Sequence, residues 1–255
     1  MTQFASTGTP LTNDALVGAS TALEVALPEI WAVLAVETRG CGFLEDRRPA
    51  ILFERHVFHE RTGGRFDDEA PDLSNPDPGG YVKGGGYQYK RLAGALALDR
   101  DAALASTSWG IGQVMGYHAV WLGYPGVEGM VARMIESEDG QLEAMMRFVR
   151  HRALDGALRA KNWAAFARGY NGSGYKKNAY DEKLESAFLH FSLNGLPDLR
   201  VRAAQVLLTY AGLEPGPVDG VLGNRTRLAL RQFQQRAGLL VTADVDDATL
   251  TALRS

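Results

Sequence analysis

Apolar residues recur every three to four positions along most of the chain, which is the spacing of an amphipathic helix. Prolines, glycines and short polar runs interrupt this pattern and mark the expected helix ends. The predicted helices cover residues 16–27, 28–39, 91–105, 112–122, 127–138, 141–152, 163–170 and 178–193. The chain up to about residue 195 is therefore expected to be mainly α-helical.

Two stretches depart from the helical pattern. Residues 49–54 form a short apolar run after a proline and predict a strand that enters a turn. Residues 62–90 are rich in Gly, Pro, Asp and Asn and predict the longest irregular segment, which suggests a functional or mobile loop. This loop carries Tyr81, Tyr87 and Tyr89, and the sequence leaves open whether these rings line a groove or pack on the body.

One carboxylate, that of Glu37, lies on the apolar face of the predicted helix 28–39. Pro28 suits the first helical position and Gly40 suits the stop, which places Glu37 in the last turn. The same stripe of the helix carries Ile30, Val33 and Leu34. Glu37 is therefore expected to lie among buried aliphatic side chains.

Burial and the negative end of the helix both disfavour an ionised carboxylate at Glu37. Its pKa is expected to rise, and a carboxyl that keeps its proton near neutral pH can act as a general acid. The alternative is a Glu37 that reaches into water beyond the helix or pairs with Arg39.

Composition limits the class of protein. The chain has 255 residues, a net charge of −3 and no strongly basic segment, so nucleic-acid binding is not expected. Cys41 is the only cysteine, which excludes an intrachain disulfide. The N-terminus shows no secretory signal pattern, and the apolar stretch 21–36 is too short and interrupted to span a bilayer. We expect a soluble, cytoplasmically made monomer without membrane insertion.

The C-terminal part reads as a separate module. A Gly–Leu–Pro–Asp break follows Asn194, which predicts one domain over residues 1–194 and a second over 195–255. Residues 216–226 contain two turn-forming Gly positions, and segments with apolar helical spacing lie on both sides of them. Residues 245–253 repeat this apolar spacing more weakly and predict a third helix. The segment resembles the bacterial peptidoglycan-binding module, a three-helix bundle. The alternative is a bundle that merely caps the first domain.

By this resemblance the module binds stem peptide or glycan of the cell wall at a shallow site. The residues to which the resemblance assigns this site are Asp219, Asn224, Arg225 and Phe233.

Three segments of the first domain also carry a resemblance. Residues 106–115, with Ser108, Gly110 and Gln113, resemble the Ser-x-Gly-x-x-Gln segment of goose-type lysozymes and lytic transglycosylases, and residues 167–172, with Tyr170 and Asn171, resemble their Ala-Tyr-Asn-Gly segment. The run Leu–Phe–Glu–Arg–His at 52–56 resembles a signature of the N-acetylmuramidase family of phage endolysins. The resemblance implies a lysozyme-like, α-rich catalytic domain with a small β element.

The same resemblance implies roles for these residues. Gly110 would allow close approach of a sugar, and Gln113 would bind its N-acetyl amide. Tyr170 and Asn171 would bind the sugar or the attacking water. Taken one at a time, Ser108 could instead be a helix cap and Asn171 a helix terminator.

Hydrolysis of a glycoside usually needs a second carboxylate, about 5–5.5 Å from the acid for retention and about 6.5–9.5 Å for inversion. Glu54 is one candidate, flanked by Arg55 and His56, and its alternative is a structural ion pair. Asp46 is the other candidate, and its alternative is a solvated turn residue. If neither reaches the site, the enzyme could be a lytic transglycosylase.

The sequence thus predicts an endolysin that cleaves the β-1,4 bond between N-acetylmuramic acid and N-acetylglucosamine, with Glu37 as the acid. No cofactor and no metal are expected, because His56, His59 and Glu60 lack zinc-ligand spacing. By resemblance, the protein would be made in the host bacterial cytoplasm, need a holin and act on peptidoglycan after release. The rivals are a lytic transglycosylase and a non-catalytic wall-binding phage protein.

Overall fold

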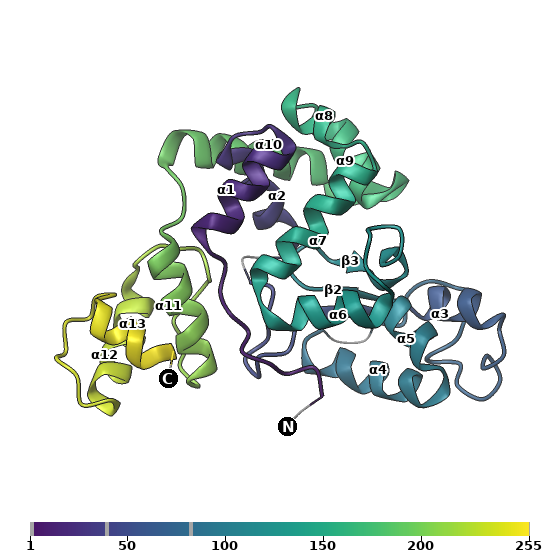
Figure 1. Ribbon diagram of the computed structural model, residues 1–255, viewed down its shortest axis with the longest axis horizontal. Helices are drawn as coiled ribbons and strands as arrows, with labels where there is room; N and C mark the ends of the chain where they lie inside the picture. Colours follow the sequence, from purple (N-terminus) through teal and green to yellow (C-terminus); the bar gives the residue numbers. More distant parts are fainter. Residues whose placement is uncertain (1–2, 39–40, 82–83, 255) are drawn as a thin grey trace. The chain divides into compact units, whose positions relative to one another are not determined.

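The computed structural model describes residues 3–38, 41–81 and 84–254 (Figure 1). The predicted helix stop at Gly40 and the alternative partner Arg39 lie outside these residues. The chain divides into two compact units, which are described separately. Unit 1 comprises residues 1–8, 42–44 and 48–151, and unit 2 comprises residues 9–41, 45–47 and 152–255.

Unit 1 combines a small sheet with helices. Its elements in chain order are β1 (Ile51–Phe53), α3 (Arg55–Thr62), α4 (Gly86–Leu98), α5 (Arg100–Ala105), β2 (Thr107–Trp109), β3 (Val114–Met115), the 3₁₀ helix η1 (Gly116–His118), α6 (Val127–Glu136) and α7 (Glu138–His151). The sheet order is β1–β2–β3 with antiparallel pairing, and Leu52 lies opposite Ser108. The predicted strand at 49–54 is confirmed at its centre.

The core of unit 1 forms around the sheet. Trp109 on β2 and Phe53 on β1 are fully buried, and the ring of Phe4 packs against Trp109 at 5.5 Å between centroids. Tyr89 is buried here too, and its hydroxyl donates to the carbonyl oxygen of Pro49. Tyr89 thus packs on the body, whereas the side chains of Tyr81 and Tyr87 are exposed.

Several predicted elements of unit 1 were wrong. Residues 112–122 form β3 and a single 3₁₀ turn instead of a helix, because the chain reverses direction after β2 through left-handed residues Gly110 (φ +66°) and Gln113 (φ +46°). The helix predicted at 91–105 begins earlier, at Gly86, and is broken at Asp99, whose carboxylate accepts from the Ala102 N–H and so caps α5. Helix α3 was not predicted.

Unit 2 is helical throughout its regular structure in the described part of the chain. Its elements are α1 (Asn13–Leu23), α2 (Leu27–Thr38), α8 (Asp155–Arg159), α9 (Trp163–Asn171), the 3₁₀ helix η2 (Ser173–Asn178), α10 (Tyr180–Asn194), α11 (Leu199–Tyr210), α12 (Asn224–Arg236) and α13 (Asp247–Arg254). Helix α2 packs along α10, where the rings of Trp31 and Phe191 lie 6.2 Å apart. Helix α8 was not predicted.

The last three helices form the predicted bundle (Figure 1). Its core consists of Ala204, Leu207, Leu208, Leu213, Ala229, Leu230, Leu250 and Leu253. The side chain of Gln205 on α11 ties down the turn before α12, because its oxygen accepts from the N–H groups of Asp219 and Gly220. Gly220 (φ +73°) cannot carry a side chain, since a Cβ there would meet the backbone of Asp198.

Among the described helices, none is by itself long and apolar enough to cross a membrane. Helices α1 and α2 meet the criteria of length and composition only when joined across a bend of 109°.

Candidate functional site

Glu37 lies in the last turn of α2, as predicted. The preceding residues of its stripe, Ile30, Val33 and Leu34, are buried. Burial raises the pKa of the Glu37 carboxyl from 4.5 to about 7, against a smaller lowering by a hydrogen bond from Asn171. The predicted rise in pKa is therefore confirmed, and its main cause is desolvation.

Helix α9 supplies the neighbours of Glu37. The helix starts at an Asn162 cap and ends at Asn171, because Gly172 (φ +78°) follows in the left-handed region. The side-chain amide of Asn171 donates to Oε1 of Glu37 at 3.2 Å. Asn171 is thus the helix terminator that the sequence offered as one interpretation, and its side chain is also a direct partner of the Glu37 carboxyl.

Two tyrosines also lie within electrostatic reach of Glu37. Burial raises the pKa of the Tyr170 hydroxyl well above its usual range, and the negative charge of Glu37 raises it further. The pKa of Tyr180, at the start of α10, is raised by the same two causes. Both phenols therefore remain protonated donors at neutral pH. Sequence analysis missed Tyr180, which lies outside the segments that carried the resemblance.

Glu54 lies between β1 and α3, at the position that precedes the first turn of α3. Its side chain is 15 % exposed. The hydroxyl of Tyr81 donates to Oε2 of Glu54 at 2.9 Å, and Nδ1 of His56 lies 3.3 Å from the same oxygen. Burial and the neighbouring Glu54 raise the pKa of Tyr81 to about 12, so this donor keeps its proton.

The other carboxylate candidate, Asp46, occupies a different setting. Phe43 and Pro49 form an antiparallel bridge, and the Leu44 N–H donates to the Arg48 carbonyl oxygen. Asp46 lies in the turn between them and is exposed, as expected of a solvated turn residue.

Ser108, Gly110 and Gln113 come together at the reversal from β2 to β3. Oε1 of Gln113 accepts from the Ser108 hydroxyl at 2.9 Å, and Nε2 donates to the carbonyl oxygens of Ala50 and Gly110. Both amide hydrogens of Gln113 are therefore used inside unit 1. Ser108 lies within β2 and caps no helix.

The packing around Gly110 gives a reason for a glycine there that the sequence did not indicate. A Cβ at this position would lie 2.5 Å from Cγ and Cδ of Gln141, so the nearest obstacle is a protein side chain. Gln141 is fully buried on α7, where its Oε1 accepts from the Ile111 N–H and its Nε2 donates to the Met134 carbonyl oxygen. The side-chain amide of Gln141 thus supports the backbone of the β2–β3 reversal, which includes Gln113.

Glu138, one turn before Gln141 on α7, is a second buried polar residue that sequence analysis missed. Its Oε1 accepts from the Gly42 N–H at 2.8 Å. The segment that follows Cys41 is thereby attached to α7. Both residues are polar positions in an amphipathic helix, which a periodicity argument assigns to the surface, so the sequence carried no signal for their burial.

In the bundle, the four predicted binding residues have different surroundings. Phe233 packs against the bundle core, and Asp219 accepts from the Val221 N–H and the Gln205 amide within the turn. Asn224 is exposed at the start of α12. Arg225 lines a pocket of about 300 Å³ together with Gly212, Leu213, Glu214, Leu228, Ala229, Gln232 and Arg236.

Within residues 3–38, 41–81 and 84–254, no group of three or more His, Cys, Asp and Glu side chains could hold a metal ion. His56 lies beside Glu54, and Nδ1 of His59 lies 2.7 Å from Oδ2 of Asp67. The Ser74 hydroxyl also donates to Asp67, and these two contacts lower the pKa of the Asp67 carboxyl.

Comparison with known proteins identifies both parts of the chain. The model of the N-acetylmuramidase family matches residues 26–192, and the model of a peptidoglycan binding domain matches residues 198–253. A crystal structure of the Burkholderia AP3 phage endolysin is similar, with 44% sequence identity and a TM-score of 0.67 over 71% of this chain and 70% of that chain. Among curated proteins, none matches.

Proposed function

This chain belongs to the N-acetylmuramidase family, and on that premise we propose that it is an endolysin that hydrolyses peptidoglycan with Glu37 as general acid. The bond cleaved is the β-1,4 link between N-acetylmuramic acid and N-acetylglucosamine. The observation that carries the proposal is the Glu37 carboxyl, which burial keeps protonated up to about pH 7 at the end of an apolar helix. A general acid needs a pKa near the working pH.

Glu37 acts on the leaving group. Its proton moves to the glycosidic oxygen as the bond from that oxygen to C1 of the muramic acid breaks. The departing N-acetylglucosamine thus leaves as a neutral alcohol. The amide of Asn171 hydrogen-bonds the carboxylate that remains, and the Tyr170 and Tyr180 hydroxyls stay protonated beside it. A water molecule supplies the new hydroxyl at C1.

Glu54 is the second carboxylate in this proposal, in preference to Asp46. Its low exposure, its hydrogen bond from Tyr81 and its place before the first turn of α3 support a carboxyl group held in a fixed position. Such a group can stabilise positive charge on the sugar or take the proton of the attacking water. Asp46, by contrast, is exposed in its turn.

The remaining predicted residues either contact the substrate or support the backbone that it contacts. We assign Tyr170 and Asn171 to contacts with the sugar at the scissile bond. Ser108 and Gln113 shape the backbone at Gly110, and the substrate would meet this backbone more than the Gln113 amide, whose hydrogens are already bound.

The C-terminal bundle holds the enzyme on its insoluble substrate, with a boundary between the two functional parts after Asn194. The end of α10 at Asn194, Gly195 in the left-handed region and the separate family matches on either side support this boundary. The pocket with Arg225 and Arg236 is the proposed contact with the wall, because guanidinium groups suit the carboxylates of stem peptides. As an endolysin, the protein would act as a monomer, made in the host cytoplasm and released through a holin.

The test is the product of peptidoglycan digestion. Mass spectrometry should find fragments with reducing muramic acid ends, and Glu37→Gln should keep the fold and wall binding but lose lysis by a factor of about 10³ or more. Fragments with 1,6-anhydromuramic ends would instead identify a lytic transglycosylase. Protein that sediments with the wall but never releases fragments would identify a non-catalytic binder.

A further inference from the structure

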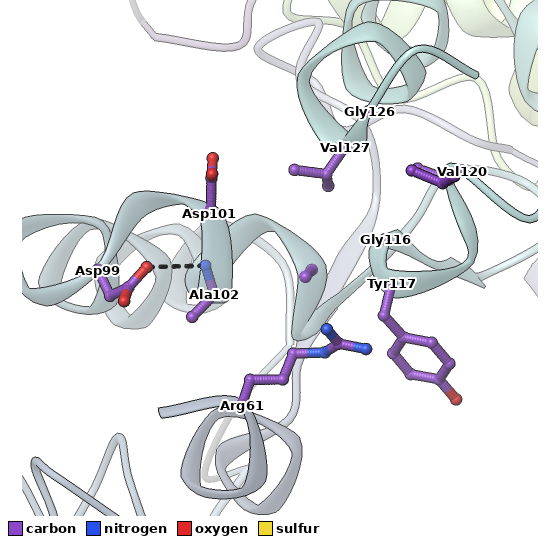
Figure 2. A pocket seen from close by; sticks show the side chains of 11 residues that line it. Arg61, Asp99, Asp101, Ala102, Gly116, Tyr117, Val120, Gly126 and Val127 are labelled. Atoms are coloured by element: carbon purple, nitrogen blue, oxygen red, sulfur yellow. Dashed lines mark hydrogen bonds between the residues drawn. The ribbon is translucent and has the colours of Figure 1, made fainter. Parts of the chain in front are cut away.

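A second pocket in unit 1 lies apart from the residues assigned to catalysis. It has a volume of about 480 Å³, within the size range of small-ligand sites. Its lining comes from α3, α5, η1 and the start of α6 (Figure 2). Arg61 lies in the last turn of α3, whereas Glu54 precedes the first turn. At 1.5 Å per residue the two positions are about 10 Å apart along the helix.

One wall of the pocket pairs a cation with an aromatic face. The guanidinium carbon of Arg61 lies 4.8 Å from the centroid of the Tyr117 ring, and Figure 2 shows Arg61 reaching from α3 toward Tyr117. The Tyr117 side chain is 39 % exposed. In the described part of the chain Arg61 forms no ion pair with any carboxylate. Its guanidinium N–H groups can therefore donate to an anionic ligand.

The aromatic surface continues beyond the pocket. The Tyr117 and His118 rings lie 4.2 Å apart, and the His118 ring stacks on that of Trp121 at 4.8 Å. Trp121 is 40 % exposed, and the neighbouring Val120 is 73 % exposed. A monomeric protein rarely leaves such a group of apolar side chains in contact with water unless it binds something. A row of rings suits an extended ligand.

Acceptor groups complete the site. Asp99, which caps α5, and Asp101 within it also line the pocket. The Asp99 carboxylate is fixed by the Ala102 N–H and by Arg65, whose Nη2 lies 2.9 Å away, whereas Asp101 is exposed. The pocket therefore offers a bidentate donor for a carboxylate, a ring face for an apolar surface, and acceptors for hydroxyl or amide hydrogens.

We propose that this pocket is an accessory saccharide-binding site that takes an amino sugar carrying a carboxylate. Arg61 binds the carboxylate, Tyr117 covers one face of the sugar ring, and Asp101 accepts from its polar hydrogens. The aromatic row through Trp121 holds the next units of the strand. This inference rests on the proposed action on peptidoglycan, because that polymer presents sugar rings with acidic substituents.

Two monosaccharides test the site without being cleaved. N-acetylmuramic acid carries a lactyl carboxylate that N-acetylglucosamine lacks, so each is titrated into ¹⁵N-labelled full-length protein and its binding is read from the amide signals of residues 61 and 117, which separates this pocket from that of Arg225. N-acetylmuramic acid should shift the amide signals around residues 61 and 117 and bind about tenfold more tightly than N-acetylglucosamine, as expected for a charge-assisted bidentate contact. Equal binding of the two sugars would overturn the proposal.

Matched variants separate the site from general surface charge. Arg61→Gln should remove the preference for N-acetylmuramic acid, whereas Arg100→Gln, on α5 but outside the lining, should keep it. Tyr117→Phe should retain binding and Tyr117→Ala should weaken it several-fold, since the ring face is what is needed. An unchanged preference in Arg61→Gln contradicts the assignment.

The proposed function is judged by a separate readout. Arg61→Gln should still release fragments with reducing muramic acid ends from whole peptidoglycan, with a higher KM and little change in kcat. If the wild-type protein releases no such fragments, the proposed function fails whatever the sugar titrations give. If it releases them while the sugars bind equally, only the accessory site is refuted.

Discussion

Glu37 is held between two opposing influences, burial among aliphatic groups and a hydrogen bond from Asn171. The first stabilises the protonated carboxyl, and the second stabilises the ionised carboxylate. The balance determines over which pH range the acid can donate a proton.

Removing the Asn171 amide should therefore shift activity toward alkaline pH. Asn171→Ala deletes the contact that lowers the Glu37 pKa, so the pKa rises above about 7 and more molecules keep the proton at pH 8. The alkaline limb of the pH–rate profile, measured as release of fragments from purified peptidoglycan, should move to higher pH even if the maximal rate falls. Asn178→Ala, in η2, is the matched control and should leave the limb in place. A limb unmoved in Asn171→Ala would show that another group controls it.

The same carboxyl should make the wild-type protein less stable at alkaline pH. Its pKa is raised from 4.5 to about 7 in the folded state, so the folded protein binds more protons than the unfolded chain between these values. The stabilisation is complete below pH 4.5 and is lost as pH rises through about 7, which amounts to about 3 kcal/mol.

Glu37→Gln has no such dependence. Denaturant titrations should find it more stable than wild type at pH 8 by up to about 3 kcal/mol, with the difference shrinking toward pH 4. Parallel stability curves for the two proteins over this range would mean that Glu37 is as well solvated in the folded state as in the unfolded chain.

At the scale of elements, the reversal between β2 and β3 depends on one side chain. The Gln113 amide accepts from Ser108 and donates to the carbonyl oxygens of Ala50 and Gly110. Gln113→Ala should lower the free energy of unfolding by about 2–3 kcal/mol, because each lost hydrogen bond contributes about 1 kcal/mol. Gln113→Gly loses the same bonds but accepts φ +46° without strain, so it should be the less destabilised variant.

Thermal melts of both variants provide the measurement. A role limited to the substrate predicts normal melting and a raised KM for both of them. Reduced stability with the order wild type, Gln113→Gly, Gln113→Ala identifies a structural role for the amide.

Periodicity predicted most helices because their burial is one-sided, as in α6 and α9. It failed at residues 112–122, where the apolar residues belong to β3 and a short turn. The left-handed backbone at Gly110 and Gln113 causes this reversal, and hydrophobic spacing does not indicate it. It also passed over Asp99, a side-chain cap within an otherwise continuous apolar pattern.

The candidate site was predictable only in part. Glu37 was recognisable because a charge on an apolar stripe is conspicuous in the sequence. Glu138 and Gln141 were not, because a buried polar side chain is distinguished by its hydrogen-bond partners, which come from residues distant in sequence. The roles of Tyr170 and Asn171 came from resemblance, and their closeness to Glu37 became visible only in three dimensions.

At the scale of the whole molecule, the bundle contacts the helix that carries Glu37. The guanidinium of Arg202 on α11, 1 % exposed, lies 5.9 Å from the ring of Trp31 on α2, and Arg47 lies over Tyr210 at 5.0 Å. Trp31 is itself 5 % exposed. The bundle therefore contacts α2 through Arg202.

Deleting residues 197–255 should consequently have two effects. Sedimentation with peptidoglycan should weaken, and the melting temperature of the remaining chain should fall by several degrees because Trp31 loses its contact with Arg202. Arg202→Ala in the full chain should reproduce part of the loss of stability while keeping the bundle. A truncated protein that melts like the full chain would show that α2 does not depend on the bundle.

The buried amide of Gln141 has a consequence for recombination between related lysins. It lies against the positions where Gly42 and Gly110 lack side chains, and it bonds the backbone of Ile111 and Met134. These four points come from stretches that a shuffling experiment would treat as separate blocks. In a chimaera that takes the β2–β3 reversal from one parent and α7 from another, Gln141 and the positions of the reversal that it contacts would come from different proteins. Crossovers that inherit both from the same parent should yield more folded progeny.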